Sequence, residues 1–197
     1  MKDIRVKITF TEPILGTASG DKELYSTYIA SNAPDAKTMQ EEIEEFGKEE
    51  VENNKMTVFP KDENGRPFLY DYQIKGFFKN ACGTLRRVSG SESSKIKAFK
   101  KEIDGLVFIN ERKIPLVFDG EIGNLQRPLR AETAQGARVA LANSETCPVG
   151  TTIEFTINLL KDDLEKVVRE WLDYGKLNGI GQWHNASYGR FSWEELS

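Results

Sequence analysis

The chain has 197 residues, of which 39% are hydrophobic and 29% charged, and its formal net charge is −4. No apolar run approaches the roughly 18 residues needed to cross a membrane, and the first residues carry charges where a secretory signal has an apolar centre. Cys82 and Cys147 lie far apart and form no Cys-x-x-Cys pair, so neither a disulfide framework nor a cysteine zinc site is predicted. We therefore expect a cytoplasmic protein with no membrane segment, no metal and no cofactor.

The first 54 residues predict a strand followed by an acidic helix. In "IRVKITF" apolar and polar residues alternate, as in a half-buried strand. Between 35 and 54, Met39, Ile43 and Phe46 recur at helical spacing. The stretch from Asp35 to Glu52 carries eight acids against two bases, a local net charge of −6.

A second helix is predicted at 71–88, where Ile74, Phe77, Phe78 and Leu85 form part of one apolar stripe. From Tyr72 to Lys101 the chain carries eight bases against one acid, a local net charge of +7. A basic face of this kind binds phosphate groups even on an acidic protein. The alternative is an ordinary solvated face, which is the more common meaning of a charge run.

The rest of the chain predicts strands around one more helix. The elements are, in order, a mobile Ser- and Lys-rich segment at 89–101, short strands at 105–110 and 114–118, a poorly patterned connection at 118–137, strands at 138–145 and 151–160, a helix at 162–175 capped by Asp162, and a strand at 187–196. Without the acidic helix the order is β-α-β-β-α-β, which indicates an α+β, ferredoxin-like (RRM-like) fold. We expect one domain, 1–197, with an acidic helical insertion at 35–54 and a long insertion at 88–128.

A glycine-rich segment, "YGKLNGIGQWHNASYGRFSW", joins the last helix to the last strand. A dinucleotide or P-loop site needs glycines between a strand and a following helix, and here the order is reversed. His184 is the only histidine, and no Gly-x-Ser-x-Gly elbow accompanies it. Arg190 is suited to hold a phosphate, and Trp183 or Tyr188 to stack on a base. A tight turn whose aromatic residues belong to the core remains an equal alternative.

The segment "GIGQWHNASYGRF" resembles the glycine-rich loop of the RAMP superfamily of CRISPR-associated proteins, which ends in Gly-Tyr-Gly-(Arg/Lys) before an apolar residue. Here Ser187 replaces the first of those glycines.

Three other stretches resemble the backbone-subunit branch of that superfamily. "ITFTEPILGTASG" is similar to its first strand. "YQIKGFFKNACGTLRR" is similar to its first helix at Ile74-Lys75-Gly76 and Lys79, without the preceding Pro and Ser. A later segment, 129–157, matches at Glu145, Pro148, Gly150, Thr151 and Phe155.

The resemblance implies a non-catalytic subunit that binds single-stranded RNA along its backbone, self-associates into a helical filament and joins other CRISPR-type subunits. It implies that the insertion at 88–128 is thumb-like. The residues predicted to contact nucleic acid are Lys75, Lys79, Arg86, Arg87, Arg127, Arg130, Gln182, Trp183, His184, Tyr188 and Arg190, with the loop glycines Gly179, Gly181 and Gly189.

Three alternatives stay open. In the first, the chain is a stand-alone relative from a phage or mobile element that coats single-stranded DNA or mimics a CRISPR subunit. In the second, it is a metal-dependent endoribonuclease that uses Asp21 or His184. In the third, it is a structural protein whose acidic helix docks on a basic partner.

Overall fold

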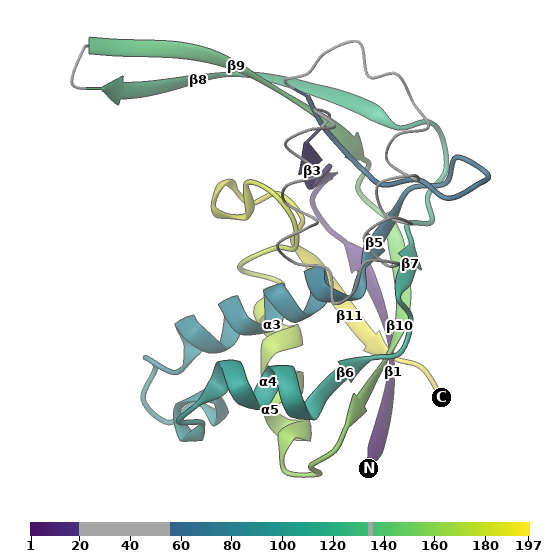
Figure 1. Ribbon diagram of the computed structural model, residues 1–197, viewed down its shortest axis with the longest axis vertical. Helices are drawn as coiled ribbons and strands as arrows, with labels where there is room; N and C mark the ends of the chain where they lie inside the picture. Colours follow the sequence, from purple (N-terminus) through teal and green to yellow (C-terminus); the bar gives the residue numbers. More distant parts are fainter. Residues whose placement is uncertain (20–55, 134–135) are drawn as a thin grey trace, which may run out of the picture. The chain divides into compact units, whose positions relative to one another are not determined.

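The computed structural model describes residues 1–19, 56–133 and 136–197 (Figure 1). They fall into two compact units. Unit 1 comprises Met1–Ile14, Leu69–Asp119 and Pro148–Ser197, and unit 2 comprises the described parts of Leu15–Phe68 together with Gly120–Cys147. The predicted acidic helix at 35–54 and the candidate Asp21 lie outside the described residues.

Unit 1 is built on a four-stranded antiparallel sheet. Its strands are β1 (Lys2–Phe10), β6 (Val107–Ile109), β10 (Thr152–Leu159) and β11 (Phe191–Glu195), in the order β11-β1-β10-β6. The alternation expected for the first strand is observed, because Ile4, Val6, Ile8 and Phe10 are all fully buried. A separate two-stranded ladder pairs β5 (Phe68–Tyr70) with β7 (Lys113–Pro115).

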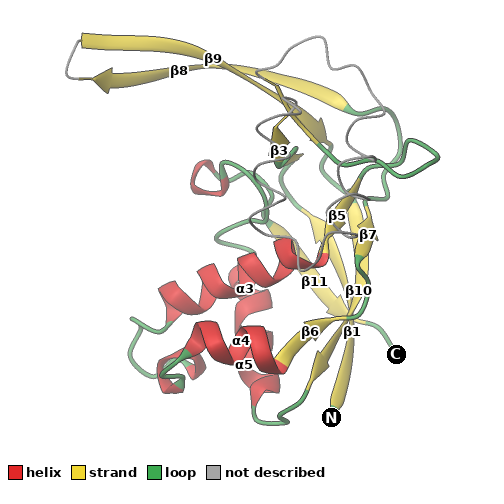
Figure 2. Cartoon of the chain, viewed as in Figure 1, coloured by secondary structure: helices red, strands yellow, loops and turns green. Residues whose placement is uncertain are grey.

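Three α-helices of unit 1 lie on one side of this sheet (Figure 2). They are α3 (Asp71–Leu85), α4 (Phe99–Leu106) and α5 (Leu164–Tyr174). The predicted α+β class is confirmed, and the order β1, α3, β6, β10, α5, β11 is compatible with the predicted RRM-like fold. Among the helices in the described ranges, none is long and apolar enough to cross a membrane.

Aromatic side chains from the helices fill the core of unit 1. Phe78 of α3 packs on Trp171 of α5 with ring centroids 5.5 Å apart. Phe77 lies 5.2 Å from Phe191, and Phe191 also meets the edge of Phe10 at 6.2 Å. These contacts fix α3 and α5 against the central strand and against the strand that follows the glycine-rich segment.

The segment predicted to be mobile at 89–101 instead contains a short 3-10 helix, η1 (Glu92–Lys95), and the start of α4. The carboxylate of Glu170 accepts hydrogen bonds from the backbone nitrogens of Glu92 (2.8 Å) and Ser93 (2.9 Å). Ser93 is fully buried, and its hydroxyl accepts a bond from Trp171 Nε1 at 3.0 Å. That prediction was wrong because the groups that hold the segment come from α5, far along the chain.

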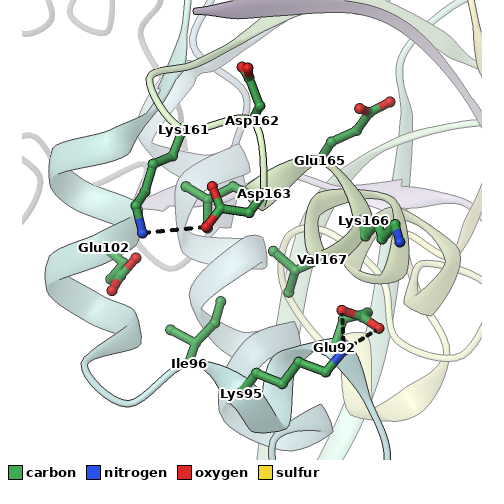
Figure 3. Close-up of a pocket in the computed structure, with 11 residues that line it drawn as sticks. Glu92, Lys95, Ile96, Glu102, Lys161, Asp162, Asp163, Glu165, Lys166 and Val167 are labelled. Atoms are coloured by element: carbon green, nitrogen blue, oxygen red, sulfur yellow. Dashed lines mark hydrogen bonds and ion pairs between the residues drawn. The ribbon is translucent and has the colours of Figure 1, made fainter.

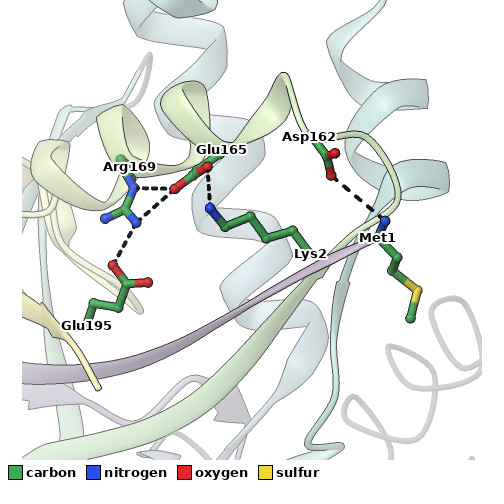
Figure 4. A network of polar contacts seen from close by, with 6 residues as sticks. All are labelled: Met1, Lys2, Asp162, Glu165, Arg169 and Glu195. Carbon is green, nitrogen blue, oxygen red and sulfur yellow. Dashed lines mark hydrogen bonds and ion pairs between the residues drawn. The ribbon is translucent and has the colours of Figure 1, made fainter. Parts of the chain in front are cut away.

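Ion pairs join the start of α5 to strands β1 and β11 (Figure 4). Lys2 Nζ lies 2.7 Å from Glu165, whose carboxylate also contacts Arg169 at 3.0 Å, and Arg169 reaches Glu195 at 2.6 Å. Asp162 does not cap α5 as predicted. The residue before the helix is Asp163, which makes no side-chain cap bond, and Asp162 faces the terminal amine at 3.8 Å.

This network predicts a pH-dependent stability. Two hydrogen bonds lower the pKa of Glu165 below its ordinary value of 4.5: the larger effect comes from Lys2 and the next from Arg169. The stabilisation is therefore present above the unfolded-state pKa and is lost as the pH falls through the lower, folded-state pKa. Glu165→Gln should make the loss of stability with acidification shallower in urea titrations at successive pH values. Lys2→Gln should act in the same direction, and slopes equal to the wild type would contradict the assignment.

Unit 2 contains a second sheet dominated by a long hairpin. The strands are β2 (Ile14–Leu15), β3 (Ala18–Ser19), β4 (Met56–Val58), β8 (Gly123–Thr133) and β9 (Gly136–Cys147). Their order is β2-β9-β4-β3, with β8 paired to β9 from Gly123↔Thr146 to Thr133↔Gly136. The predicted connection at 118–137 is therefore largely strand. Of the insertion predicted at 88–128, only the last six residues fall in this hairpin.

A largely buried carboxylate ties β9 to the segment after β4 within unit 2. Glu145 accepts hydrogen bonds from the backbone nitrogen of Phe59 at 2.8 Å and from Lys61 Nζ at 2.9 Å. The side chains of Glu145 and Lys61 are 13% and 15% exposed. Beside them the Thr57 hydroxyl donates to Ser144 Oγ at 2.8 Å.

Candidate nucleic-acid interface

The glycine-rich loop, Gly175–Arg190, connects α5 to β11 and closes on itself through its backbone. Ile180 N donates to Gly189 O at 3.0 Å. A Cβ atom on Gly179 would lie 2.2 Å from the carbonyl carbon of Gly189, and one on Gly175 would lie 2.2 Å from the Phe191 ring. Two of the loop glycines thus permit close packing of the chain against itself, which the sequence alone did not distinguish from close approach to a ligand.

Gly189 is the most constrained position of this loop. Its φ is +68°, a left-handed value that disfavours any side chain, and an added Cβ would lie 2.0 Å from Ile180 O. Its amide donates to Pro13 O at 2.9 Å, which fixes the loop to the segment after β1. The two limbs of the loop are therefore held in one conformation before any ligand binds.

The tip of the loop contains two non-glycine residues with left-handed backbones. Trp183 has φ 53° and Ser187 has φ 76°, and they flank the short 3-10 helix η2 (His184–Ala186). His184 Nδ1 lies 3.0 Å from Gly181 O, so the ring is held by the loop itself. Strained backbone that is over-determined by its surroundings is found preferentially at binding and catalytic sites.

The loop brings five predicted contact residues together. Trp183 and Tyr188 meet edge to face with ring centroids 6.0 Å apart, and both are partly exposed. Gln182 and His184 lie beside them in sequence and are also partly exposed. Arg190 Nε is buried and has no hydrogen-bond partner among the described residues. A partly exposed aromatic pair, with an arginine two residues after Tyr188, is suited to a nucleotide, in which a base and a phosphate are linked.

The first two predicted bases of α3 have partners in and next to α4. Lys79 pairs with the Asp104 carboxylate at 2.6 Å. Lys75 donates to the Asp104 backbone oxygen at 3.2 Å and lies 4.8 Å from the centre of the Phe108 ring. Burial of its ammonium group lowers the pKa of Lys75 below its ordinary value. These two lysines therefore hold α3 against its neighbours, and a ligand would have to share them with Asp104.

The other two bases lie at the end of α3 and are exposed. Arg86 lies over the Phe99 ring of α4, 5.3 Å from its centre, whereas Arg87 makes no side-chain hydrogen bond, ion pair or ring contact within the described part of the chain. A pocket of about 450 Å³ opens here, which we call the α3–α4 pocket. Its lining is Lys79, Asn80, Gly83, Thr84, Arg86, Arg87 and Phe99, with no acidic side chain.

The structure separates the predicted residues into groups. Three of the basic side chains, Lys75, Lys79 and Arg86, contact α4. Phe77, on another side of α3, contacts Phe191 at the end of the loop. Figure 1 shows α4 and the loop on opposite sides of α3. Arg127 and Arg130 belong to β8 of unit 2. Sequence reasoning missed Phe99, whose only signal was its place in the Lys-rich segment predicted to be mobile.

A second pocket, of about 560 Å³, lies between η1, α4 and the start of α5 (Figure 3). Its charges are mixed and largely paired. Lys95 contacts Glu92 at 2.7 Å, and Lys161 contacts Asp163 at 3.6 Å. Within the ranges that the structure describes, no three His, Cys, Asp or Glu side chains come together to hold a metal ion.

Comparison with known proteins places this fold. No family model and no curated protein matches the sequence. One similar solved structure is a chain of the type III-B Cmr-beta complex bound to cognate target RNA, with a TM-score of 0.53 and 14% identity over 99% of this chain. Another is a chain of a type IV-B CRISPR complex, with a TM-score of 0.50 and 11% identity over 100% of this chain.

The fold is shared with chains of CRISPR complexes.

The match extends over 58% of the Cmr-beta chain and 91% of the type IV-B chain. This chain therefore spans somewhat over half the length of the first of these. At these identities the likeness is one of fold.

Proposed function

We propose that the protein is a non-catalytic RNA-binding subunit of a CRISPR-type ribonucleoprotein, and that unit 1 is a ferredoxin-like domain of the RAMP type. The observation that carries the proposal is the similarity of fold over essentially the whole chain to chains of two CRISPR complexes, one of them bound to RNA. The order β11-β1-β10-β6 supports the assignment of unit 1, since β1 and β10, the first and third strands of this sheet along the chain, are central and their neighbours are antiparallel.

The glycine-rich loop supplies the chemistry of this proposal. Its backbone is fixed by the contact of Gly189 with Ile180 and Pro13, so little ordering is required when a strand binds. Trp183 and Tyr188 offer ring surface to an unstacked base, and Arg190 offers a charged donor to a phosphate. Stacking on an aromatic side chain contributes about 1–3 kcal/mol per base and accepts any base, as a subunit that follows an RNA backbone requires.

Self-association along the RNA, and assembly with other CRISPR-type subunits, complete the proposal. A subunit that repeats along one strand binds each segment through the same sugar-phosphate contacts, so binding is expected to be cooperative and steeply dependent on salt. The hairpin of unit 2 carries Arg127 and Arg130 on β8, and we propose that these arginines add to the phosphate contacts.

The loop provides the test. We expect the protein to shift single-stranded RNA in an electrophoretic mobility assay at low salt, with log Kd rising linearly with log salt by about 0.7 per phosphate contacted. Trp183→Ala should weaken RNA binding at least about fivefold, since one stacked base is lost.

The matched control for this test is Leu177→Ala. Leu177 lies in the same loop and is 67% exposed, so its removal should leave both fold and affinity unchanged. Absence of RNA binding at low salt, or equal affinities for the Trp183 and Leu177 variants, would count against the proposal. Titration with DNA of the same sequence separates RNA recognition from general single-strand coating, because only RNA carries a 2′-hydroxyl.

A further inference from the structure

We propose that the α3–α4 pocket is a second site, separate from the glycine-rich loop, that binds the phosphate group of a nucleotide. The sequence predicted that Lys79, Arg86 and Arg87 contact nucleic acid. This inference goes beyond that prediction and beyond the proposed function, because it places the three residues at one discrete pocket that takes a single phosphate group and does not depend on the loop. The pocket is formed by the last turns of α3 and by Phe99 at the start of α4.

The charge of the lining selects an anion. Lys79, Arg86 and Arg87 contribute three positive charges, and the only carboxylate that contacts any of them among the described residues is that of Asp104, on Lys79. The second pocket shows the opposite case, because there Lys95 and Lys161 are matched by neighbouring carboxylates (Figure 3). An anion that enters the α3–α4 pocket therefore does not have to displace a carboxylate from Arg86 or Arg87 among the described residues.

Two of the three cations have a partner before a ligand arrives. The guanidinium carbon of Arg86 lies 5.3 Å from the centre of the Phe99 ring, within the range of a cation–π contact. A guanidinium in such a contact can still form the bidentate bonds that it makes with phosphate oxygens. Lys79 contacts Asp104 at 2.6 Å. Of the three, Arg87 is therefore the side chain that a ligand would have to order.

The remaining lining residues fit a phosphate ester. Asn80 and Thr84 provide an amide and a hydroxyl at the wall of the pocket. A Cβ atom on Gly83 would stand 3.6 Å from the Phe99 ring, an ordinary van der Waals distance, so the ring borders the pocket directly at this position. The volume of about 450 Å³ falls in the range of small-molecule sites and is ample for a single nucleotide.

The place of the pocket separates it from the loop. Phe77 contacts Phe191 at the end of the loop on one side of α3, whereas the pocket opens where the other side meets α4. A base stacked on Trp183 and a phosphate in the pocket would therefore lie on different sides of this helix. A terminal phosphate, a backbone phosphodiester or a free nucleotide each carries the group that the pocket recognises.

The test uses the full chain, labelled with ¹⁵N, and three probes. Adenosine monophosphate carries a phosphomonoester, adenosine carries none, and the dinucleotide ApA carries a phosphodiester. We expect adenosine monophosphate and inorganic phosphate to shift the amide signals of Gly83 and Thr84, and adenosine to leave them unchanged. Arg87→Gln should raise the Kd for adenosine monophosphate at least fivefold.

Lys166→Gln is the matched control, because Lys166 is an exposed base that lines the second pocket. It should leave the Kd unchanged. Equal shifts with adenosine and with its monophosphate, or a Kd unaffected by Arg87→Gln, would overturn the proposal. Binding of ApA as tight as that of the monophosphate identifies backbone phosphate as the source, and weaker binding identifies a terminal phosphate or nucleotide.

These outcomes are independent of the RNA-binding proposal. Adenosine monophosphate reports on the pocket even if no RNA binds, and the Trp183 variant reports on the loop even if the pocket is empty. Arg87 is exposed, so the variant should fold as the wild type does, and its circular dichroism spectrum checks this. The signals of Gly83 and Thr84 in the unaltered protein give a reading that needs no substitution.

Discussion

Gly189→Ala is expected to destabilise unit 1 by about 2–4 kcal/mol. The new methyl carbon would stand 2.0 Å from the carbonyl oxygen of Ile180, and the residue would have to keep a φ of +68°. The neighbour is backbone, so the clash is relieved only by opening the loop and losing its bonds to Ile180 and Pro13. Urea unfolding followed by circular dichroism measures the effect.

Substitutions at two other glycines of unit 1 separate the cost of the positive φ from the cost of the clash. Gly150 also has a positive φ, +89°, but an added Cβ meets nothing within 4 Å, so Gly150→Ala should cost only about 1–2 kcal/mol. Gly76 lies inside α3 with open space around it, and Gly76→Ala should stabilise by about 0.5–1 kcal/mol. Equal effects at Gly189 and Gly150 would mean that the backbone contact with Ile180 contributes nothing.

Glu145→Ala is expected to destabilise unit 2 by about 3 kcal/mol. The substitution leaves the Lys61 ammonium group without this carboxylate in a site that is 15% exposed, and it removes the acceptor of the Phe59 amide. Removing a carboxylate from a largely buried ammonium group, and leaving a backbone donor without its acceptor, each cost free energy. Amide hydrogen exchange of β9, compared with that of β10, measures the effect within the unit concerned.

Glu145→Gln divides the contributions at this site. The amide oxygen of glutamine still accepts the bond from Phe59 N, whereas the charge opposite Lys61 is lost. We expect an intermediate loss of stability. If the alanine and glutamine variants lose the same amount, the charge alone accounts for the effect. If neither loses stability, Glu145 has no structural role in this unit.

The regular elements of unit 1 could be predicted because each buries one face. Buried Ile4, Val6 and Ile8 occur at every second position of β1, and buried Ile74 and Phe78 are four residues apart in α3. The spacing of apolar residues in the sequence therefore predicts which face is buried. The hairpin of unit 2 has no such signature. At its start Asn124, Gln126 and Arg127 are exposed and Leu125 is only partly covered, so β8 could not be told from a loop.

The candidate site was predictable in composition but not in geometry. The charge run identified Lys75, Lys79, Arg86 and Arg87, yet only the fold shows that the first two contact Asp104 and that the last two border a pocket. The loop glycines were identified as sites of close approach, but their partners are other atoms of the same loop. Such contacts depend on distances between segments, which local patterns do not encode.

The three tryptophans of the sequence, Trp171, Trp183 and Trp193, all belong to unit 1. Trp171 is fully buried and Trp183 is partly exposed in the loop, so their emission reports on the packing of one unit and on ligands at its loop. Unit 2 contains no indole. Tryptophan fluorescence, excited where tyrosine does not absorb, therefore follows the unfolding of unit 1 alone, while far-ultraviolet ellipticity follows both units. A difference between the two midpoints would measure how independently the hairpin unit unfolds.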